Sequence, residues 1–402
     1  MRRRLAPTEP SLANVARINR NLQFVRWPLT FALLPWIRFR ATGLEHFPMK
    51  GPVLVVSNHV GFMDPVVIIL SANRTISFMA TPSLLDEGML ARVMRWFGVI
   101  PKKKFIADTS AIRRLKAWVK HGGAVGLFPE AVRCWDGQTA ALMPGTERLV
   151  KMLGVPVVTV RIRNAYRQWP RWAERARRGK ILVEFDPPRT FTKKTPDEEI
   201  MAYMTERLQV RHDEAPCFPV TGKGLARGIS NVVWACPSCG AFGKMAEDDD
   251  HISCTACNTR WRVDPTTDLI AEGSSERLRI DEVIARITEG LRARDMVPDP
   301  ERFAADGVLM ESEPMQLIER TDDEPIAVAE GRLRLDRDTL CVIGDDGASR
   351  WSLALDELRV VTVDMRRRLQ FRTHAHLYEA MIPTESVVVW ELVAAHWAPR
   401  VK

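Results

Sequence analysis

The sequence lacks the features expected of a membrane-spanning or secreted protein. The most apolar stretch of its first forty residues, Trp27–Ile37, is interrupted by Pro28 and Pro35 and is far shorter than the roughly 20 residues that a spanning helix needs. No small-residue cleavage site follows an uninterrupted apolar core, so no secretory signal is predicted. Only seven of the 402 residues are cysteine, and four of them form two CxxC pairs, which indicates metal binding in a reducing compartment rather than disulfides. We expect a cytoplasmic protein.

Acidic side chains are nearly absent from the first forty residues, where Glu9 stands alone. The basic residues there are Arg2, Arg3, Arg4, Arg17, Arg20, Arg26, Arg38 and Arg40. The formal net charge of +8 favours an anionic partner, and arginines and tryptophans beside a short apolar stretch are typical of a helix in the headgroup region. Residues 1–40 are therefore predicted to form basic, amphipathic helices, peripheral on the inner face of the membrane. A packed helical hairpin with a solvated basic flank is the alternative.

Short apolar runs alternate with helical patterns over residues 41–212, as in PVLVVS, AVGLFPE and VPVVTVRI. This alternation predicts an α/β domain with a mixed, largely parallel sheet flanked by helices. Prolines and glycines mark a linker over 213–230. An amphipathic helical connector is predicted over 266–305, and a small β-rich domain with a C-terminal helix over 306–402.

One segment after an apolar strand carries residues suited to acid–base chemistry. It reads Ser57-Asn58-His59-Val60-Gly61-Phe62-Met63-Asp64-Pro65. In a continuous helix His59 and Asp64 would lie about 140° apart, but Pro65 restricts Asp64 to extended geometry and suits the first helical position. We therefore predict that a loop brings the carboxylate to the imidazole. One ring nitrogen then stays protonated, and the other can accept a proton from a hydroxyl.

This segment resembles the opening of the PlsC-type glycerolipid acyltransferases, whose signature is NHxxxxD. Three later stretches are similar to further blocks of that family in the same order: Gly98–Phe105, Leu127–Arg133 (similar to FPEGTR) and Val155–Val158. The resemblance extends over roughly residues 25–210. It implies an enzyme of phospholipid biosynthesis in which His59 is the general base and Asp64 orients it. The acyl donor would be acyl-CoA or acyl-carrier protein, the acceptor 1-acylglycerol 3-phosphate, and no catalytic cofactor is implied.

The resemblance also implies residues that bind substrate: Asn58, Lys102, Lys103, Lys104, Glu130 and Arg133. A guanidinium offers phosphate a bidentate fork, whereas lysines act as point charges. Ala131 and Val132 stand where the family has glycine and threonine, and three lysines replace an arginine-terminated pattern. These departures leave another lysophospholipid or a lipid alcohol as an alternative acceptor. A non-catalytic lipid-binding scaffold is the alternative of another class, although such a protein needs neither a base nor its orienting acid.

The two CxxC pairs form the second motif. They are Cys236-Pro237-Ser238-Cys239 and Cys254-Thr255-Ala256-Cys257, fourteen residues apart. Four thiolates suit tetrahedral zinc, and residues 231–265 resemble a four-cysteine zinc ribbon; redox-active pairs or disulfides are the alternatives. Such a closed site predicts a structural zinc ion for folding or for contact with a protein partner. The acids at 247–250 would repel phosphate, so no nucleic acid is expected.

Residues 306–402 resemble a PH-like or GRAM-like β domain closed by a helix that contains Trp390 and Trp397. The trio Arg366–Arg368 would meet anionic headgroups or form a solvated hairpin tip.

Overall fold

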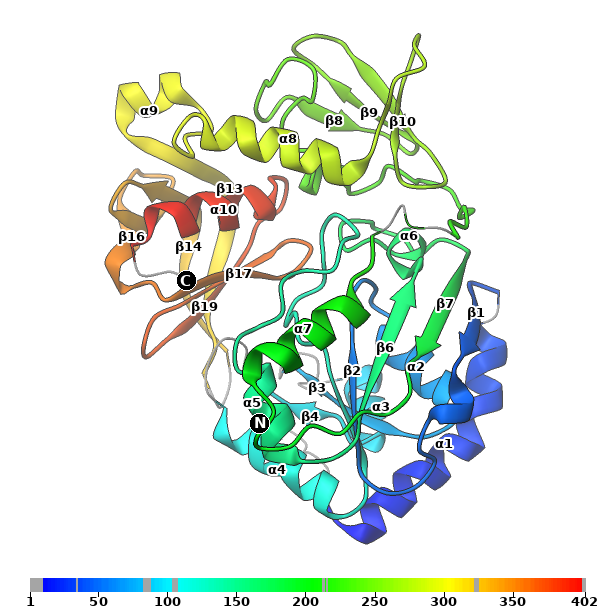
Figure 1. Ribbon diagram of the computed structural model, residues 1–402. Coiled ribbons are helices and arrows are strands. Elements are labelled where there is room, and N and C mark those ends of the chain that lie inside the picture. Colours follow the sequence, from blue (N-terminus) through cyan, green and yellow to red (C-terminus); the bar gives the residue numbers. More distant parts are fainter. Residues whose placement is uncertain are drawn as a thin grey trace. The chain divides into compact units, whose positions relative to one another are not determined.

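The computed structural model (Figure 1) describes residues 10–33, 35–81, 88–102, 108–211, 214, 216–321 and 325–399. The chain forms two compact units. The first unit comprises Met1–Arg171 and Arg175–Gly222, and the second comprises Trp172–Glu174 and Lys223–Lys402.

The first unit is built on a seven-stranded sheet with strand order β1-β7-β6-β2-β5-β3-β4. The strands are β1 (Ile37–Thr42), β2 (Val53–Ser57), β3 (Ile76–Ala80), β4 (Ile100–Pro101), β5 (Ala124–Leu127), β6 (Val157–Arg163) and β7 (Gly179–Phe185). All neighbours pair in parallel except β6 and β7, which are antiparallel. Every residue of β2 is buried, as is usual for a parallel strand covered on both faces. The predicted mixed, largely parallel sheet is confirmed.

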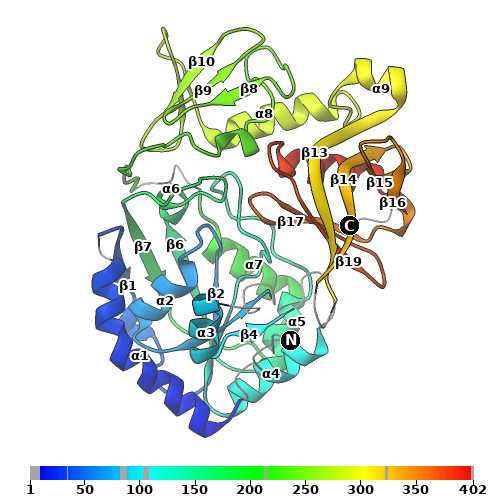
Figure 2. The ribbon, with the colours of Figure 1, turned by 180° about the vertical axis from the view of Figure 1, so that it is seen from behind.

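Helices cover both faces of this sheet (Figures 1 and 2). They are α1 (Leu12–Leu33), α2 (Asp64–Ala72), α3 (Gly88–Trp96), α4 (Thr109–Lys120), α5 (Thr146–Leu153), α6 (Ala165–Gln168) and α7 (Asp197–Leu208). One core joins apolar side chains of α1, α4, α5 and α7 to those of the sheet, with Trp118 of α4 and Met204 of α7 fully buried. Asp108 caps α4 by accepting a hydrogen bond from the Ala111 N–H. α2 instead contacts β1 and β7.

The N-terminal helix α1 is continuous from Leu12 to Leu33 with Pro28 inside it, so the predicted interruption at Pro28 is wrong. Pro28 and Phe24 are both exposed, and water can bond to the carbonyl that loses its N–H partner. Residues 1–9, with three of the predicted arginines, lie outside the described part of the chain. Within the described residues, no helix is long and apolar enough to cross a membrane.

The second unit begins with a five-stranded antiparallel sheet of order β12-β11-β10-β9-β8. Its strands are β8 (Met245–Glu247), β9 (His251–Cys254), β10 (Arg260–Val263), β11 (Leu269–Ala271) and β12 (Arg277–Leu278). The amphipathic helix α8 (Ile280–Arg292) follows and buries Val283, Ile287 and Leu291. The short helix α9 (Pro300–Asp306) leads into the C-terminal strands.

The C-terminal part of the second unit is a seven-stranded antiparallel sheet of order β16-β15-β14-β13-β19-β18-β17. Its strands are β13 (Val308–Glu319), β14 (Ile326–Asp336), β15 (Thr339–Ile343), β16 (Ser349–Ala354), β17 (Val360–Met365), β18 (Arg368–Arg372) and β19 (Leu377–Met381). Helix α10 (Val387–Trp397) packs against β17 and β18 and buries Trp390. The predicted β-rich C-terminal region is confirmed, while its PH-like identity and the predicted domain boundaries stay predictions.

Candidate active site

His59 and Asp64 meet in the loop that joins β2 to α2. Asp64 Oδ2 lies 3.0 Å from His59 Nδ1 and accepts the backbone N–H groups of Val60 at 2.9 Å and Gly61 at 2.8 Å. Three donors on one carboxylate oxygen assign the proton to Nδ1, which leaves His59 Nε2 as an acceptor. The helix begins at Asp64 itself rather than at Pro65, so the prediction that Asp64 is extended is wrong. A proline is tolerated in a first turn because the N–H it lacks would have no partner within the helix.

The imidazole packs on one face against a stack of two phenylalanine rings, Phe128 and Phe78. The His59 ring stacks on Phe128 with centroids 4.0 Å apart, and Phe128 stacks on Phe78 at 5.0 Å. Gly126 makes room for this stack, since a Cβ there would lie 2.5 Å from the Phe78 ring. The His59 side chain is still 20% exposed. The imidazole is thus fixed on one side and accessible on another.

Glu130 holds the His59 backbone in place. It is 2% exposed; its Oε1 accepts the His59 N–H at 2.7 Å, and its Oε2 accepts the Ala140 N–H at 2.8 Å. Burial raises the pKa of Glu130 to about 7, although both N–H groups oppose the rise. Because each oxygen already accepts a backbone N–H, Glu130 positions the loop that carries His59.

Asn58 joins the end of β2 to β6. Its side chain is fully buried, donates to the Ile162 carbonyl at 2.9 Å and accepts the Ile162 N–H at 2.7 Å. These two bonds take the place of the backbone hydrogen bonds between β2 and β6 at the point where β2 ends and the loop begins. Asn58 therefore sets the direction in which the chain enters the segment of His59.

Two arginines lie near the imidazole. The Arg133 guanidinium is 5.5 Å from the centre of the Phe62 ring, and the Cys134 N–H donates to the His59 carbonyl at 3.3 Å. Arg171 donates from Nη1 to the Arg133 carbonyl at 2.9 Å. Burial is the main cause that lowers the pKa of His59, both arginines lower it further, and Asp64 opposes them.

The sequence reasoning missed Arg171. The sequence feature that could have pointed to Arg171 is a segment with seven arginines, residues 161–178, which comes directly after the last block that resembles the acyltransferases. Neither spacing nor composition distinguishes Arg171 from the other six. Only the fold brings it to Arg133, which lies 38 residues earlier in the chain.

The predicted phosphate-binding lysines follow β4. The Lys102 N–H donates to the Ala80 carbonyl at 2.8 Å, which places Lys102 on the same carboxyl edge of the sheet as His59. β4 is three strands from β2, roughly 14 Å at about 4.8 Å per strand. Lys103 and Lys104 lie outside the described residues.

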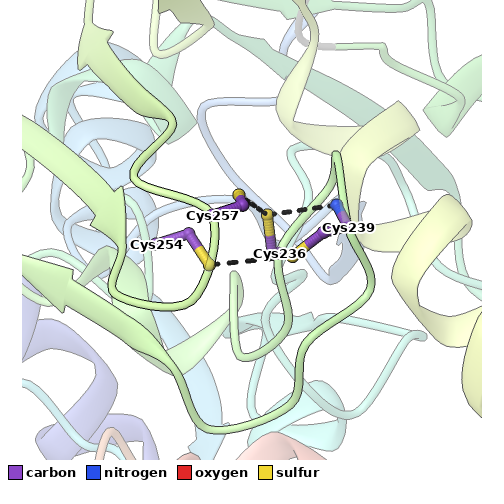
Figure 3. A group of neighbouring side chains, drawn as sticks. All are labelled: Cys236, Cys239, Cys254 and Cys257. Atoms are coloured by element: carbon purple, nitrogen blue, oxygen red, sulfur yellow. Dashed lines mark hydrogen bonds between the residues drawn. The ribbon is translucent and has the colours of Figure 1, made fainter.

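The second unit contains a cluster of four thiols (Figure 3), formed by Cys236, Cys239, Cys254 and Cys257, none of which is in a disulfide. All four sulfurs lie within 4.8 Å of one another, with two pairs at 3.7 and 3.8 Å. Zinc–sulfur bonds of about 2.3 Å in tetrahedral geometry separate sulfurs by about 3.8 Å, whereas a disulfide needs about 2.0 Å. The cluster therefore has the donor set and spacing that could bind zinc.

The backbone around the thiols is also suited to a metal. The N–H groups of Cys239 and Ala256 each approach a cysteine sulfur at 3.4 Å. Gly240 and Asn258, which follow the second cysteine of each pair, have positive φ of 74° and 61°, as their tolerance of left-handed geometry predicts.

Comparison with known proteins gives matches to acyltransferases. Residues 38–163 match the family model described as Acyltransferase. A 1-acyl-sn-glycerol-3-phosphate acyltransferase of Borreliella burgdorferi is 28% identical over 133 residues, which covers 33% of this chain and 53% of that protein. A probable 1-acyl-sn-glycerol-3-phosphate acyltransferase of Mycoplasma genitalium is 28% identical over 120 residues, covering 28% of this chain and 44% of that protein.

Among solved structures, the 1-acyl-sn-glycerophosphate (LPA) acyltransferase PlsC from Thermotoga maritima matches with a TM-score of 0.40 and 23% identity, over 47% of this chain and 75% of that chain. The chain spans about half the length of the curated relatives it matches.

Proposed function

We propose that the protein, whose residues 38–163 match the Acyltransferase family model, transfers an acyl group from acyl-CoA or acyl-carrier protein to 1-acylglycerol 3-phosphate. The observation that carries the proposal is the His59–Asp64 pair, with Nδ1 held by the carboxylate and the ring accessible. The names of the matching relatives support the choice of acceptor.

The reaction needs no acyl-enzyme. Nε2 of His59 removes the proton of the acceptor hydroxyl while the oxygen attacks the thioester carbonyl carbon. The tetrahedral intermediate then collapses, the carbon–sulfur bond breaks, and the leaving thiolate takes the proton back from the imidazolium. Asp64 orients the ring and stabilises its charged form. Because its pKa is lowered, His59 is neutral and ready to act as a base near pH 7.

Arg133 is the proposed partner of the acceptor's phosphate, since a guanidinium close to His59 would hold the acceptor with its hydroxyl near the base. Lys102 would add a positive charge farther along the same edge of the sheet.

Helix α1 is the proposed contact with the membrane. Phe24, Trp27 and Phe31 lie on one stripe of α1 and are exposed by 74, 61 and 65%. Exposed aromatic residues on a helix that contains Arg17, Arg20 and Arg26 suit the interface of an anionic bilayer. We infer that the protein binds peripherally at the cytoplasmic face of the membrane.

The four-cysteine cluster is proposed to hold a structural zinc ion. Four thiolates leave no open coordination position, so the metal would stabilise the second unit rather than take part in acyl transfer. Native mass spectrometry should find one zinc ion per chain, and this ion should be lost from Cys254→Ser. A wild-type chain isolated without any bound metal would contradict the proposal.

The acceptor is tested by acyl transfer from radiolabelled acyl-CoA and acyl-carrier protein to acceptors presented in anionic vesicles. Product with 1-acylglycerol 3-phosphate supports the proposal. Product only with an uncharged or headgroup-bearing lysolipid would instead favour a different acceptor, and no product with any acceptor would favour a lipid-binding scaffold.

A further inference from the structure

Arg171 is a buried cation with a defined environment in the first unit. It is 5% exposed, and its guanidinium lies 4.0 Å from the centre of the Trp135 ring. The Trp135 carbonyl in turn accepts the Tyr166 hydroxyl at 2.9 Å. Contact with the face of the indole limits the orientations that the guanidinium can adopt.

The group that Arg171 contacts is the peptide that carries Arg133. Its Nη1 donates to the Arg133 carbonyl. The next N–H, that of Cys134, donates to the His59 carbonyl, and Glu130 accepts the His59 N–H. Segment 130–134 is thus bonded to the backbone of His59 on both sides of its Cα, and Arg171 bonds to the same segment.

Arg171 also brings a second positive charge to the site. The Arg133 guanidinium lies over Phe62, and Phe62 packs edge-on against Trp169 at 5.3 Å. Each of the two arginines thus lies against an aromatic ring, and both lie close enough to His59 to lower the pKa of its imidazole. Two guanidinium groups match the double negative charge of a phosphate monoester better than one.

We propose that Arg171 is a positioning and specificity residue, which fixes Arg133 toward the phosphate of the acceptor and adds its own charge to favour phosphorylated over uncharged acceptors. This inference rests on the function proposed above. It assigns to Arg171 a role in acceptor binding and none in donor binding.

The test compares wild type with Arg171→Gln, Arg171→Lys and Arg133→Gln. Loss of a charge-assisted contact predicts that Arg171→Gln raises KM for 1-acylglycerol 3-phosphate by about tenfold or more, with KM for the acyl donor unchanged. Arg171→Lys keeps the charge and should recover part of the loss. Arg171→Gln should also move the titration of His59, followed by NMR, to higher pH, because one positive charge is gone; a merely structural role would leave that titration in place.

Arg177→Gln is the matched control. Arg177 is 2% exposed, lies in the same arginine-rich segment and donates to the Arg167 carbonyl at 3.5 Å. It is not among the main causes of the lowered His59 pKa. This variant should alter stability while leaving acceptor KM and the His59 titration unchanged.

Binding of sn-glycerol 3-phosphate, a soluble probe with the same phosphate, separates the two proposals. Weaker probe binding in Arg171→Gln supports the inference even if the wild type transfers no acyl group, an outcome that would reject only the proposed function. Normal acyl transfer with unchanged KM, probe binding and His59 titration in folded Arg171→Gln would overturn the inference while the proposed function stands.

Discussion

Replacing Glu130 with glutamine tests whether a buried carboxylate holds the loop of His59. Each carboxylate oxygen accepts one backbone N–H, from His59 and from Ala140. A glutamine keeps the shape but has a single acceptor oxygen, so its NH2 group would face one of the two N–H donors. Glu130→Gln therefore loses one hydrogen bond and leaves a buried N–H without a partner, which costs about 1–3 kcal/mol.

The lost hydrogen bond is offset by removal of a buried charge. Burial raises the pKa of Glu130 from 4.5 to about 7, which at about 1.4 kcal/mol per pH unit corresponds to about 3 kcal/mol of destabilisation when the carboxyl is ionised. The two effects nearly cancel at pH 8. We expect the free energy of unfolding to change by less than about 2 kcal/mol, while the displaced His59 loop lowers kcat/KM by about tenfold or more.

Stability and activity should depend on pH in opposite directions. Because the pKa of Glu130 is raised on folding, its protonated form stabilises the protein; this contribution is complete below pH 4.5 and disappears as the pH rises through about 7. Activity has the opposite dependence, since a protonated carboxyl accepts the two facing N–H groups more weakly than the carboxylate does. The wild-type kcat/KM should therefore fall as the pH drops through about 7, whereas the pKa of His59 is lowered, so its protonation is expected at a lower pH than that of a free imidazole.

The assay is kcat/KM from pH 5.5 to 9 for wild type, Glu130→Gln and a control. The fall in kcat/KM near pH 7, which we call the acidic limb of the profile, should be absent from Glu130→Gln. Glu147→Gln is the control, because Glu147 is 7% exposed and accepts the Gly145 N–H at the start of α5; its profile should match the wild type. An unchanged limb near pH 7, or wild-type activity, in Glu130→Gln would refute the reasoning.

Three further predictions follow from backbone strain, packing and exposure. Ala131 has a φ of 61°, so Ala131→Gly should raise the free energy of unfolding by about 1 kcal/mol; a lower urea midpoint would contradict this. Gly126→Ala would press a methyl group against Phe78 and should destabilise by about 1–3 kcal/mol and lower kcat; normal stability and kcat would exclude a role for the ring stack. Trp27→Ala with Phe31→Ala should weaken sedimentation with anionic vesicles but not transfer to detergent-dispersed acceptor, and undiminished sedimentation would argue against α1 as the membrane contact.

Local patterns account for what the sequence predicted of the site. A buried strand followed by a loop and a helix with proline in its first turn is encoded within residues 53–65, so the approach of His59 to Asp64 could be expected before the fold was known. The spacing of the two CxxC pairs is equally local, and all four thiols do come together. Alternation of strands and helices likewise predicted the sheet.

The features of the site that the sequence did not predict depend on contacts between segments that are distant in the chain. Glu130 reaches a backbone N–H 71 residues away, and side-chain-to-backbone bonds of this kind leave no sequence pattern. Arg171 reaches Arg133 only because the chain turns after β6 and α6. The helix also continues through Pro28, because the exposed side of α1 lets water compensate for the missing N–H.

The central claim is that His59 is the general base of an acyl transfer. Its most direct test is the rate of transfer from radiolabelled acyl-CoA and acyl-carrier protein to 1-acylglycerol 3-phosphate in anionic vesicles, for wild type and for His59→Ala shown by circular dichroism to be folded. General-base assistance is worth about 100- to 10,000-fold, so the variant should lose at least about 100-fold in kcat. A folded His59→Ala protein that transfers acyl groups at the wild-type rate would contradict the account.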